Sequence, residues 1–179
     1  DRKAEVEDSY SMRFRMKNGV EGSMQQTAGA WGPSATLWRC AGTKGTVWQY
    51  TATDVASAFT WAELHTTDRN PRSRHTRELV HRVAHQLAAA GWKLQEVTTD
   101  NGSEFRAHDF RDAVHQLGAR QRFIRAGRPN SNGCVERAQL TILEECWRPA
   151  FARSLVPKIT ALTQDLDEYL IDYNYDRAH

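Results

Sequence analysis

The 179 residues are enough for one domain with a sizeable core, and the net charge of +2 at pH 7 is too small by itself to indicate nucleic-acid binding. No apolar run approaches the roughly 18 residues of a membrane span and no signal peptide opens the chain, so we expect no membrane association. The three cysteines form no CxxC pair, which argues against a zinc ribbon or a disulfide framework and fits a reducing compartment. The first residue is Asp rather than Met, which indicates a fragment or an excised domain.

The first part of the chain is irregular, and clear periods follow it. Residues 1–41 show no clear period, and we leave them unassigned as a candidate degenerate N-terminal segment. Residues 47–53 and 58–64 are rich in β-branched and aromatic side chains, which predicts an antiparallel pair of strands. Residues 73–90 repeat apolar positions with a helical period, and Gly91 is a suitable C-terminal stop for that helix.

The second half of the chain alternates short strands with helices. In chain order we predict a strand over 94–99, a helix over 109–117 that Gly118 ends, a strand over 122–124, a loop over 127–133, and helices over 134–147 and 160–173. Pro149 and Pro157 are expected to break the chain between the last two helices. This alternation predicts an α/β domain with a mixed central sheet flanked by helices.

Two segments of the chain carry the residues that suggest chemistry, Thr98–Phe105 and Asn130–Arg137. The first ends a strand with Asp100 and a tight turn, and the second leads from a flexible loop into a helix with Glu136 in its first turn. Thirty-five residues separate the two carboxylates. An Asp at a strand end and a Glu at a helix start can converge on one divalent metal, and such sites cut or join phosphodiester backbones. The pattern therefore points to an enzyme that acts on DNA.

Both segments, together with residues 45–57 and 172–179, resemble the catalytic core of retroviral-integrase-type transposases from bacterial insertion sequences. The resemblance runs over residues 42–179, which we take as the catalytic domain. It implies a ribonuclease-H-like fold, Asp-Asp-Glu chemistry with Mg²⁺ or Mn²⁺, and DNA integration at element ends and target DNA. It also implies self-association into a homo-oligomer and a bacterial, cytoplasmic, nucleoid-associated location.

Asp100 and Glu136 are the candidate catalytic and metal-binding residues. Asn101 and Gly102 force a turn directly after Asp100, so its side chain is expected at a sheet edge where ligands collect. The alternative for Asp100 is an ordinary carboxylate that caps its own turn. The alternative for Glu136 is a carboxylate that complements the helix dipole. The resemblance assigns Glu136 the role of the third catalytic carboxylate.

The first catalytic carboxylate is missing from the place where the resemblance puts it. The expected position lies near residues 31–37, and no Asp or Glu stands between Gly22 and Thr53. Asp54 is the nearest acid, although it occupies a position that the family does not use for metal. Either Asp54 substitutes as a catalytic residue or the first ligand is absent, and we favour its absence. A frameshift in an old element would explain both the loss and the irregular first 41 residues.

Clustered arginines suggest a nucleic-acid surface beside the carboxylates. Between residues 120 and 135 there are four arginines and no acid, and a second basic stretch covers residues 69–82. We predict DNA contacts for four residues around the loop: Arg125, Arg128, Asn130 and Arg137. The alternative is a pair of solvated arginine-rich faces. His81 and His85 share one helix face, but no Glu follows His81 as in an HExxH motif, so we take both as surface residues.

Three functions remain open on the sequence. The first is a transposase or integrase core that joins DNA ends by metal-dependent strand cleavage and transfer. The second is a catalytically inactive, DNA-binding remnant of such a core, which the missing first Asp supports. The third is a ribonuclease-H-like nuclease of another kind, which the Asn-Gly-x-x-Glu entry to the last catalytic helix disfavours.

Overall fold

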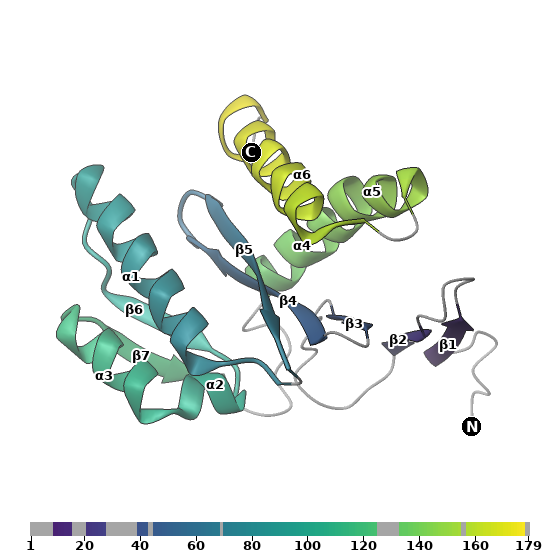
Figure 1. The fold of residues 1–179 in the computed structure, drawn as a ribbon. Helices are drawn as coiled ribbons and strands as arrows, with labels where there is room; N and C mark the ends of the chain where they lie inside the picture. Colours follow the sequence, from purple (N-terminus) through teal and green to yellow (C-terminus); the bar gives the residue numbers. More distant parts are fainter. Residues whose placement is uncertain are drawn as a thin grey trace, which may run out of the picture.

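Figure 1 shows the computed structural model, in which residues 9–15, 21–27, 39–42, 45–68, 70–124, 133–154 and 157–177 are described. In this part of the chain no helix is both long and apolar enough to cross a membrane. Two strands, β1 (Ser9–Arg15) and β2 (Glu21–Thr27), pair antiparallel in the segment where no period was evident. The pairing runs from Ser9 opposite Thr27 to Arg15 opposite Glu21.

A three-stranded antiparallel sheet forms the middle of the molecule. It consists of β3 (Arg39–Gly42), β4 (Gly45–Thr53) and β5 (Thr60–Thr67) in that order. The register of β4 and β5 runs from Thr46 opposite Thr67 to Thr53 opposite Thr60, which confirms the predicted pair. The first residues of β4 pair with β3, so β4 is the central strand of this sheet.

A second, two-stranded sheet is parallel and lies beside two helices. It pairs β6 (Glu96–Thr99) with β7 (Arg120–Phe123), and α2 (Ser103–Arg106) and α3 (His108–Gln116) connect the two strands. The predicted strand over 94–99 is therefore shorter, and the strand predicted over 122–124 begins two residues earlier. Gly118 ends α3 with a φ of 70°, in the left-handed region that glycine adopts without strain.

The helix α1 (Ser73–Ala89) joins the two sheets through its side chains. One of its faces packs against β4 and β5 with the buried residues Trp48, Tyr50, Trp61, Leu79 and Val83. Another face packs against α3 with the buried residues Val80, Phe110, Ala113 and Val114. As predicted, the helix ends at a left-handed glycine, Gly91, with a φ of 81°. The helical period of 73–90 therefore reports a helix that is buried on two sides.

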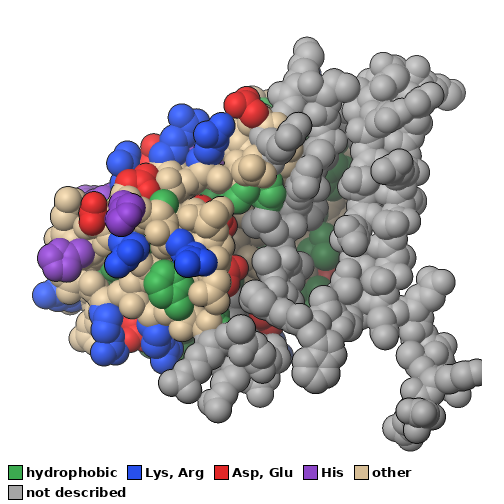
Figure 2. Space-filling model, turned by 90° about the horizontal axis from the view of Figure 1, so that it is seen from below, with side chains coloured by type: hydrophobic (Ala, Val, Ile, Leu, Met, Phe, Trp, Pro, Cys, Tyr) green, Lys and Arg blue, Asp and Glu red, His purple; other side chains and the backbone are tan. Residues whose placement is uncertain are grey.

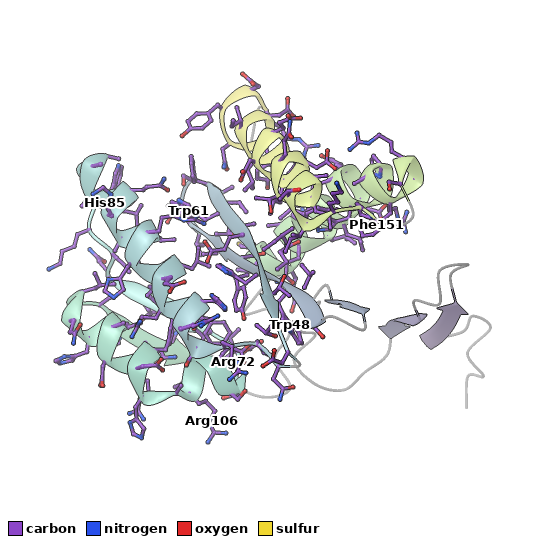
Figure 3. The ribbon with its side chains drawn as sticks, in the orientation of Figure 1. Trp48, Trp61, Arg72, His85, Arg106 and Phe151 are labelled. Carbon is purple, nitrogen blue, oxygen red and sulfur yellow. The ribbon has the colours of Figure 1, made fainter. Side chains whose placement is uncertain are left out.

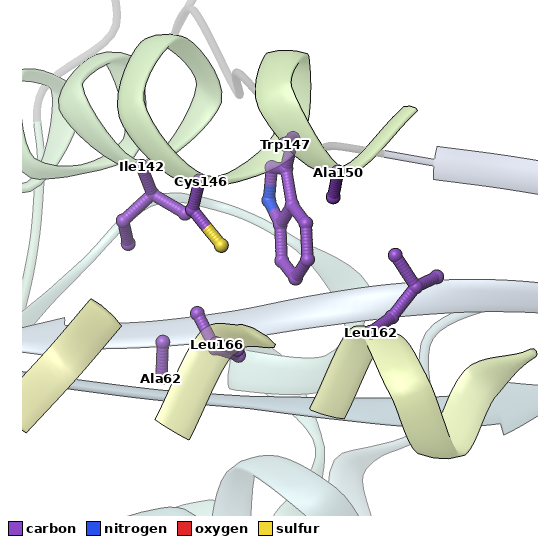
Figure 4. Close-up of a cluster of buried hydrophobic side chains, with 7 residues drawn as sticks. All are labelled: Ala62, Ile142, Cys146, Trp147, Ala150, Leu162 and Leu166. Atoms are coloured by element: carbon purple, nitrogen blue, oxygen red, sulfur yellow. The ribbon is translucent and has the colours of Figure 1, made fainter. Parts of the chain in front are cut away.

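The C-terminal helices cover the sheet on the side opposite α1 (Figure 1). They are α4 (Gly133–Ile142), α5 (Arg148–Arg153) and α6 (Ile159–Ile171), and π-helical turns follow α4 (η2, Leu143–Trp147) and α6 (η3, Asp172–Asp176). Figure 4 shows the core that they form with β5, in which Trp147 is almost fully buried. Its indole Nε1 donates a hydrogen bond of 2.6 Å to Gln49 Oε1 on β4. This bond ties the helical layer to the central strand.

The prediction that Pro149 ends the helix is wrong, because the preceding turn is wider than an α-helical turn. A proline in a regular helix lacks a donor, and its ring crowds the carbonyl four residues earlier. Here the π-helical turn η2 precedes the proline, and the Arg148 N–H donates to the Leu143 carbonyl five residues back. The wider turn makes room for the ring, and Pro149 lies in the first turn of α5. The helical run ends later, at Ser154.

Asn174 connects the C-terminal segment to the edge of β5. Its side-chain amide donates to the Thr60 carbonyl and its oxygen accepts the Thr60 N–H, both at 2.8 Å. We expect Asn174→Ala to lower the free energy of unfolding by about 1–3 kcal/mol, because both backbone groups lose their partner. Urea denaturation checks this, with the exposed Asp176→Ala as a control expected within about 0.5 kcal/mol of the parent. Equal effects of the two substitutions would contradict a stabilising role for the two Asn174–Thr60 hydrogen bonds.

Two described cysteines lie on one helical run, Cys134 at its start and Cys146 in η2, and they differ in burial. Cys134 is exposed and Cys146 is buried, and both are free. Burial raises the pKa of the Cys146 thiol from 9.0 to about 12. At neutral pH the thiolate fraction of Cys146 is then about a thousandfold lower than that of a thiol with a pKa of 9.0. Of these two cysteines, we therefore expect only Cys134 to be alkylated in the folded chain. Mass spectrometry in a Cys40→Ser background checks this, and equal labelling of both thiols would contradict it.

Candidate functional site

The turn after β6 holds Asp100 at the edge of the parallel sheet. Asp100 Oδ1 accepts the Gly102 N–H at 2.8 Å, and the Asn101 side-chain amide donates to the Ile124 carbonyl at 3.1 Å. The second bond ties the turn to the end of β7. Because β6 and β7 are parallel, their carboxyl ends meet at this edge, where ligands collect in α/β proteins. The Gly102 bond is also what the alternative interpretation expects, a carboxylate that caps its own turn, so the catalytic role of Asp100 stays a prediction.

Glu104 is a second carboxylate beside Asp100 that sequence reasoning missed. It lies in α2, and a Cβ placed on Gly102 would stand 2.9 Å from its carboxyl carbon. Burial raises the pKa of the Glu104 carboxyl, and the negative charge of Asp100 raises it further. The available signal was the position of Glu104 within the same Asp-Asn-Gly-Ser-Glu segment, one short turn after Asp100. The two carboxyl groups therefore form one local acidic pair.

Glu136 is carried by a different element from Asp100, and its convergence with Asp100 on one metal stays a prediction. It lies in the first turn of α4 and is partly buried, and α4 packs against β4. The loop that leads into α4 falls outside the described residues, and with it the predicted DNA contacts Arg125, Arg128 and Asn130. Arg137, the fourth predicted contact, is exposed on α4.

Asp54 lies in the turn between β4 and β5 of the central sheet. Its Oδ2 accepts two hydrogen bonds from Ser57, one from the backbone N–H at 2.9 Å and one from the hydroxyl at 2.6 Å. These bonds close the turn between β4 and β5. In Figure 1 this turn lies near the C-terminal part of α6, whereas α2, which follows Asp100, lies at the opposite side of the view. A catalytic role for Asp54 stays a prediction.

The strand that opens the sheet carries no carboxylate. β3 consists of Arg39, Cys40, Ala41 and Gly42, and it pairs with the start of β4. Residues 31–37, where the sequence placed the missing first Asp, lie outside the described residues.

The comparison with protein families decides the relationship. A model of the integrase core domain matches residues 26–129, more than half of the chain, and a second integrase core domain model matches residues 117–179. The chain belongs to the integrase core family. The predicted resemblance is confirmed at the level of this family. A search of curated proteins finds no match.

Solved structures show that this integrase core has the predicted ribonuclease-H-like α/β fold. The catalytic core domain of BIV integrase is similar with a TM-score of 0.57 at 17% identity, over 80% of this chain and 84% of that chain. A chain of the simian T-cell lymphotropic virus intasome, solved with PP2A regulatory subunit B56 gamma, is similar with a TM-score of 0.54 at 20% identity. That match covers 96% of this chain and 48% of the other, so this integrase core spans about half the length of the viral chain.

Several arginines of this integrase core are neutralised by acids in the described residues. Arg120 and Arg122 both pair with Glu96, and this lowers the pKa of the Glu96 carboxyl. Two further ion pairs join Arg72 to Asp68 and Arg82 to Glu63. Figure 2 shows Lys and Arg side chains spread over the described face together with acidic and histidine side chains. The described part of the basic stretches is thus a mixed surface.

His81 and His85 are both exposed on α1. His85 lies near the C-terminal end of that helix (Figure 3). Neither belongs to the group of metal-ligating side chains that lie together in the described residues, which agrees with their assignment as surface histidines.

Proposed function

We propose that this chain is the catalytic core of a bacterial insertion-sequence transposase that cleaves and joins DNA strands with Mg²⁺ or Mn²⁺. The observation that supports this most is the position of Asp100, held by its turn at the carboxyl edge of the parallel sheet in an integrase core fold. The proposed partners are the DNA ends of the element and target DNA. Self-association and a nucleoid-associated cytoplasmic location follow from the same proposal.

Asp100 and Glu136 are the residues that would hold the metal, and Glu104 offers a further oxygen beside Asp100. Carboxylate oxygens are the ligands that Mg²⁺ prefers. The raised pKa of the Glu104 carboxyl reflects burial beside another negative charge, an arrangement that a cation would relieve. When bound, the metal shields phosphate charge and makes an attacking water or hydroxyl more nucleophilic.

The residues around Asp100 would hold its carboxylate in place before a cation binds. The Gly102 N–H and the Asn101 amide hold the Asp100 turn against the end of β7, so the carboxylate needs little reordering to receive a cation. Arg125, Arg128, Asn130 and Arg137 are the proposed contacts to DNA phosphates, which would fix the strand without reading its sequence.

A second candidate function is an inactive DNA-binding remnant of such a core. The observation that favours it is β3, the opening strand, which holds neither Asp nor Glu. The Ser57 hydrogen bonds also engage Asp54 in a turn. Without the first catalytic carboxylate the site would hold metal weakly, and strand transfer would be slow or lost.

Nicking of supercoiled plasmid by the purified chain separates the two candidates. We expect nicking with Mn²⁺ that EDTA abolishes, and joining of labelled element ends to target DNA when those ends are supplied. Circular dichroism must show that the chain is folded. Salt-sensitive DNA binding by a folded chain without metal-dependent nicking would reject the enzyme in favour of the remnant.

A further inference from the structure

Two histidines and a glutamate meet where β5 ends and α1 begins, and none of them belongs to the proposed catalytic carboxylates. His65 comes from β5, whereas His75 and Glu78 lie one helical turn apart near the start of α1. Their ligand atoms all lie within 4.8 Å of one another, in the described part of the chain. The His75 side chain is 7% exposed, that of His65 25% and that of Glu78 57%. The cluster therefore has a buried base and one side open to solvent.

The hydrogen bonds around the cluster match the outer shell of a metal site. His65 Nε2 lies 2.9 Å from Glu63 Oε1, so a proton on Nε2 is held by a carboxylate and Nδ1 is left as a ligand. Metal-binding histidines characteristically donate their second ring N–H in this way. Glu63 is fixed in turn by Arg82 at 2.8 Å. The second histidine offers Nδ1, which faces Glu78 Oε2 at 3.4 Å.

The electrostatic state of His75 suits a ligand. Burial lowers the pKa of its imidazole, and the neighbouring His65 lowers it further. The convergence of the three ligand atoms, rather than this pKa, makes the cluster a candidate site.

The required rearrangement is small and involves the more accessible groups of the cluster. Ligand atoms on a tetrahedral zinc stand about 3.3 Å apart, given bonds of about 2.0–2.1 Å, so the cluster must contract by roughly 1.5 Å at its widest. The two rings are stacked, with centroids 3.8 Å apart and planes 20° apart, so one ring must turn until both lone pairs converge. His65 is the more exposed ring and can turn. Arg74 Nε, which lies 3.2 Å from His75 Nε2, is on an exposed residue that can move into solvent.

We propose that His65, His75 and Glu78 bind a zinc ion, with water as the fourth ligand, and that this ion fastens the end of β5 to the start of α1. Two imidazoles and one carboxylate favour zinc and related transition metals over Mg²⁺, which takes oxygen ligands. The site is thus distinct in chemistry and in residues from the carboxylates at Asp100. Tyr50, whose ring centroid lies 5.5 Å and 5.6 Å from those of the two histidines, closes its inner side.

The test measures the melting temperature of the metal-free full chain with and without excess Zn²⁺. Zinc should raise the Tm of the parent by at least about 3 °C, because the ion binds the folded chain alone. His65→Gln and Glu78→Gln should each lose most of this rise, and both replace exposed or partly exposed groups that the core does not need. His85→Gln on the same helix and Asp100→Asn should keep the full rise.

Cobalt gives a second readout that a structural role alone would not produce. Co²⁺ should develop visible d–d absorption in the parent, and His65→Gln should weaken Co²⁺ binding by at least about tenfold. A thiolate-to-cobalt charge-transfer band would place the ion at a cysteine and overturn the proposal. So would an unchanged Tm in the parent with zinc, or a zinc response in Glu78→Gln equal to that of His85→Gln.

Discussion

Replacing Asp100 with Asn should reduce Mn²⁺-dependent plasmid nicking by at least about 100-fold. The substitution keeps an oxygen that can accept the Gly102 N–H, so the turn should survive, but it removes the negative charge that draws the cation. Metal ions contribute several kcal/mol of charge stabilisation to such reactions, and each 1.4 kcal/mol corresponds to a factor of ten in rate. The measurement is the initial nicking rate at saturating metal, with Tm recorded for each variant.

Asp54→Asn is the matched comparison for this result. We expect its nicking rate to stay near that of the parent, because Asp54 closes the β4–β5 turn through Ser57. Loss of nicking in both variants would instead give Asp54 the role of the first carboxylate. Full activity of Asp100→Asn would contradict the proposed site.

Trp147→Ala should lower the free energy of unfolding by about 3–5 kcal/mol. The indole is 1% exposed, so its removal leaves a large cavity between α4, α6 and the sheet. It also leaves Gln49 Oε1 without the donor that Trp147 supplies at 2.6 Å. Urea denaturation followed by circular dichroism gives the value.

Trp92→Ala is the control for this loss, since Trp92 is 70% exposed. Its effect should stay within about 0.5 kcal/mol. Trp147→Phe should fall between the two, because it keeps most of the apolar volume and loses the indole N–H. A Trp147→Ala chain as stable as Trp92→Ala would show that the helical layer does not depend on this side chain.

Elements with a strong local signal were predictable from the sequence. The β4–β5 pair has two β-rich runs and a short connection, and α1 and α3 have helical periods that end at Gly91 and Gly118. Both glycines adopt a positive φ, so the stops rest on backbone chemistry that a sequence displays directly. The α/β order of the remaining elements then followed from the alternation of strands and helices.

Features that depend on distant contacts or on unusual helical geometry were not predictable. Pro149 indicated a break because a sequence does not show that the preceding turn is π-helical. Apolar residues alternate in β1, but β2 has a single large apolar residue, Met24, so the pairing of the two strands was not evident from the pattern.

The candidate site also has a part that was predictable from the sequence and a part that depends on folding. The turn at Asp100 was visible in Asp-Asn-Gly, whereas the charge coupling of Glu104 to Asp100 depends on how α2 folds back. The meeting of His65 with His75 depends on the path of the chain between β5 and α1.

The position of α1 between the two sheets has a consequence for catalytic geometry. Among the described residues no backbone ladder joins the β3–β4–β5 sheet to the β6–β7 sheet. Asp100 belongs to one sheet, and Glu136 is carried by α4 on the other. The distance between the two carboxylates therefore depends on side-chain packing on both sides of α1. We expect Val80→Ala, which touches neither carboxylate, to loosen the packing of α1 against α3 and to weaken metal binding, as measured by the Mn²⁺ concentration that gives half-maximal nicking.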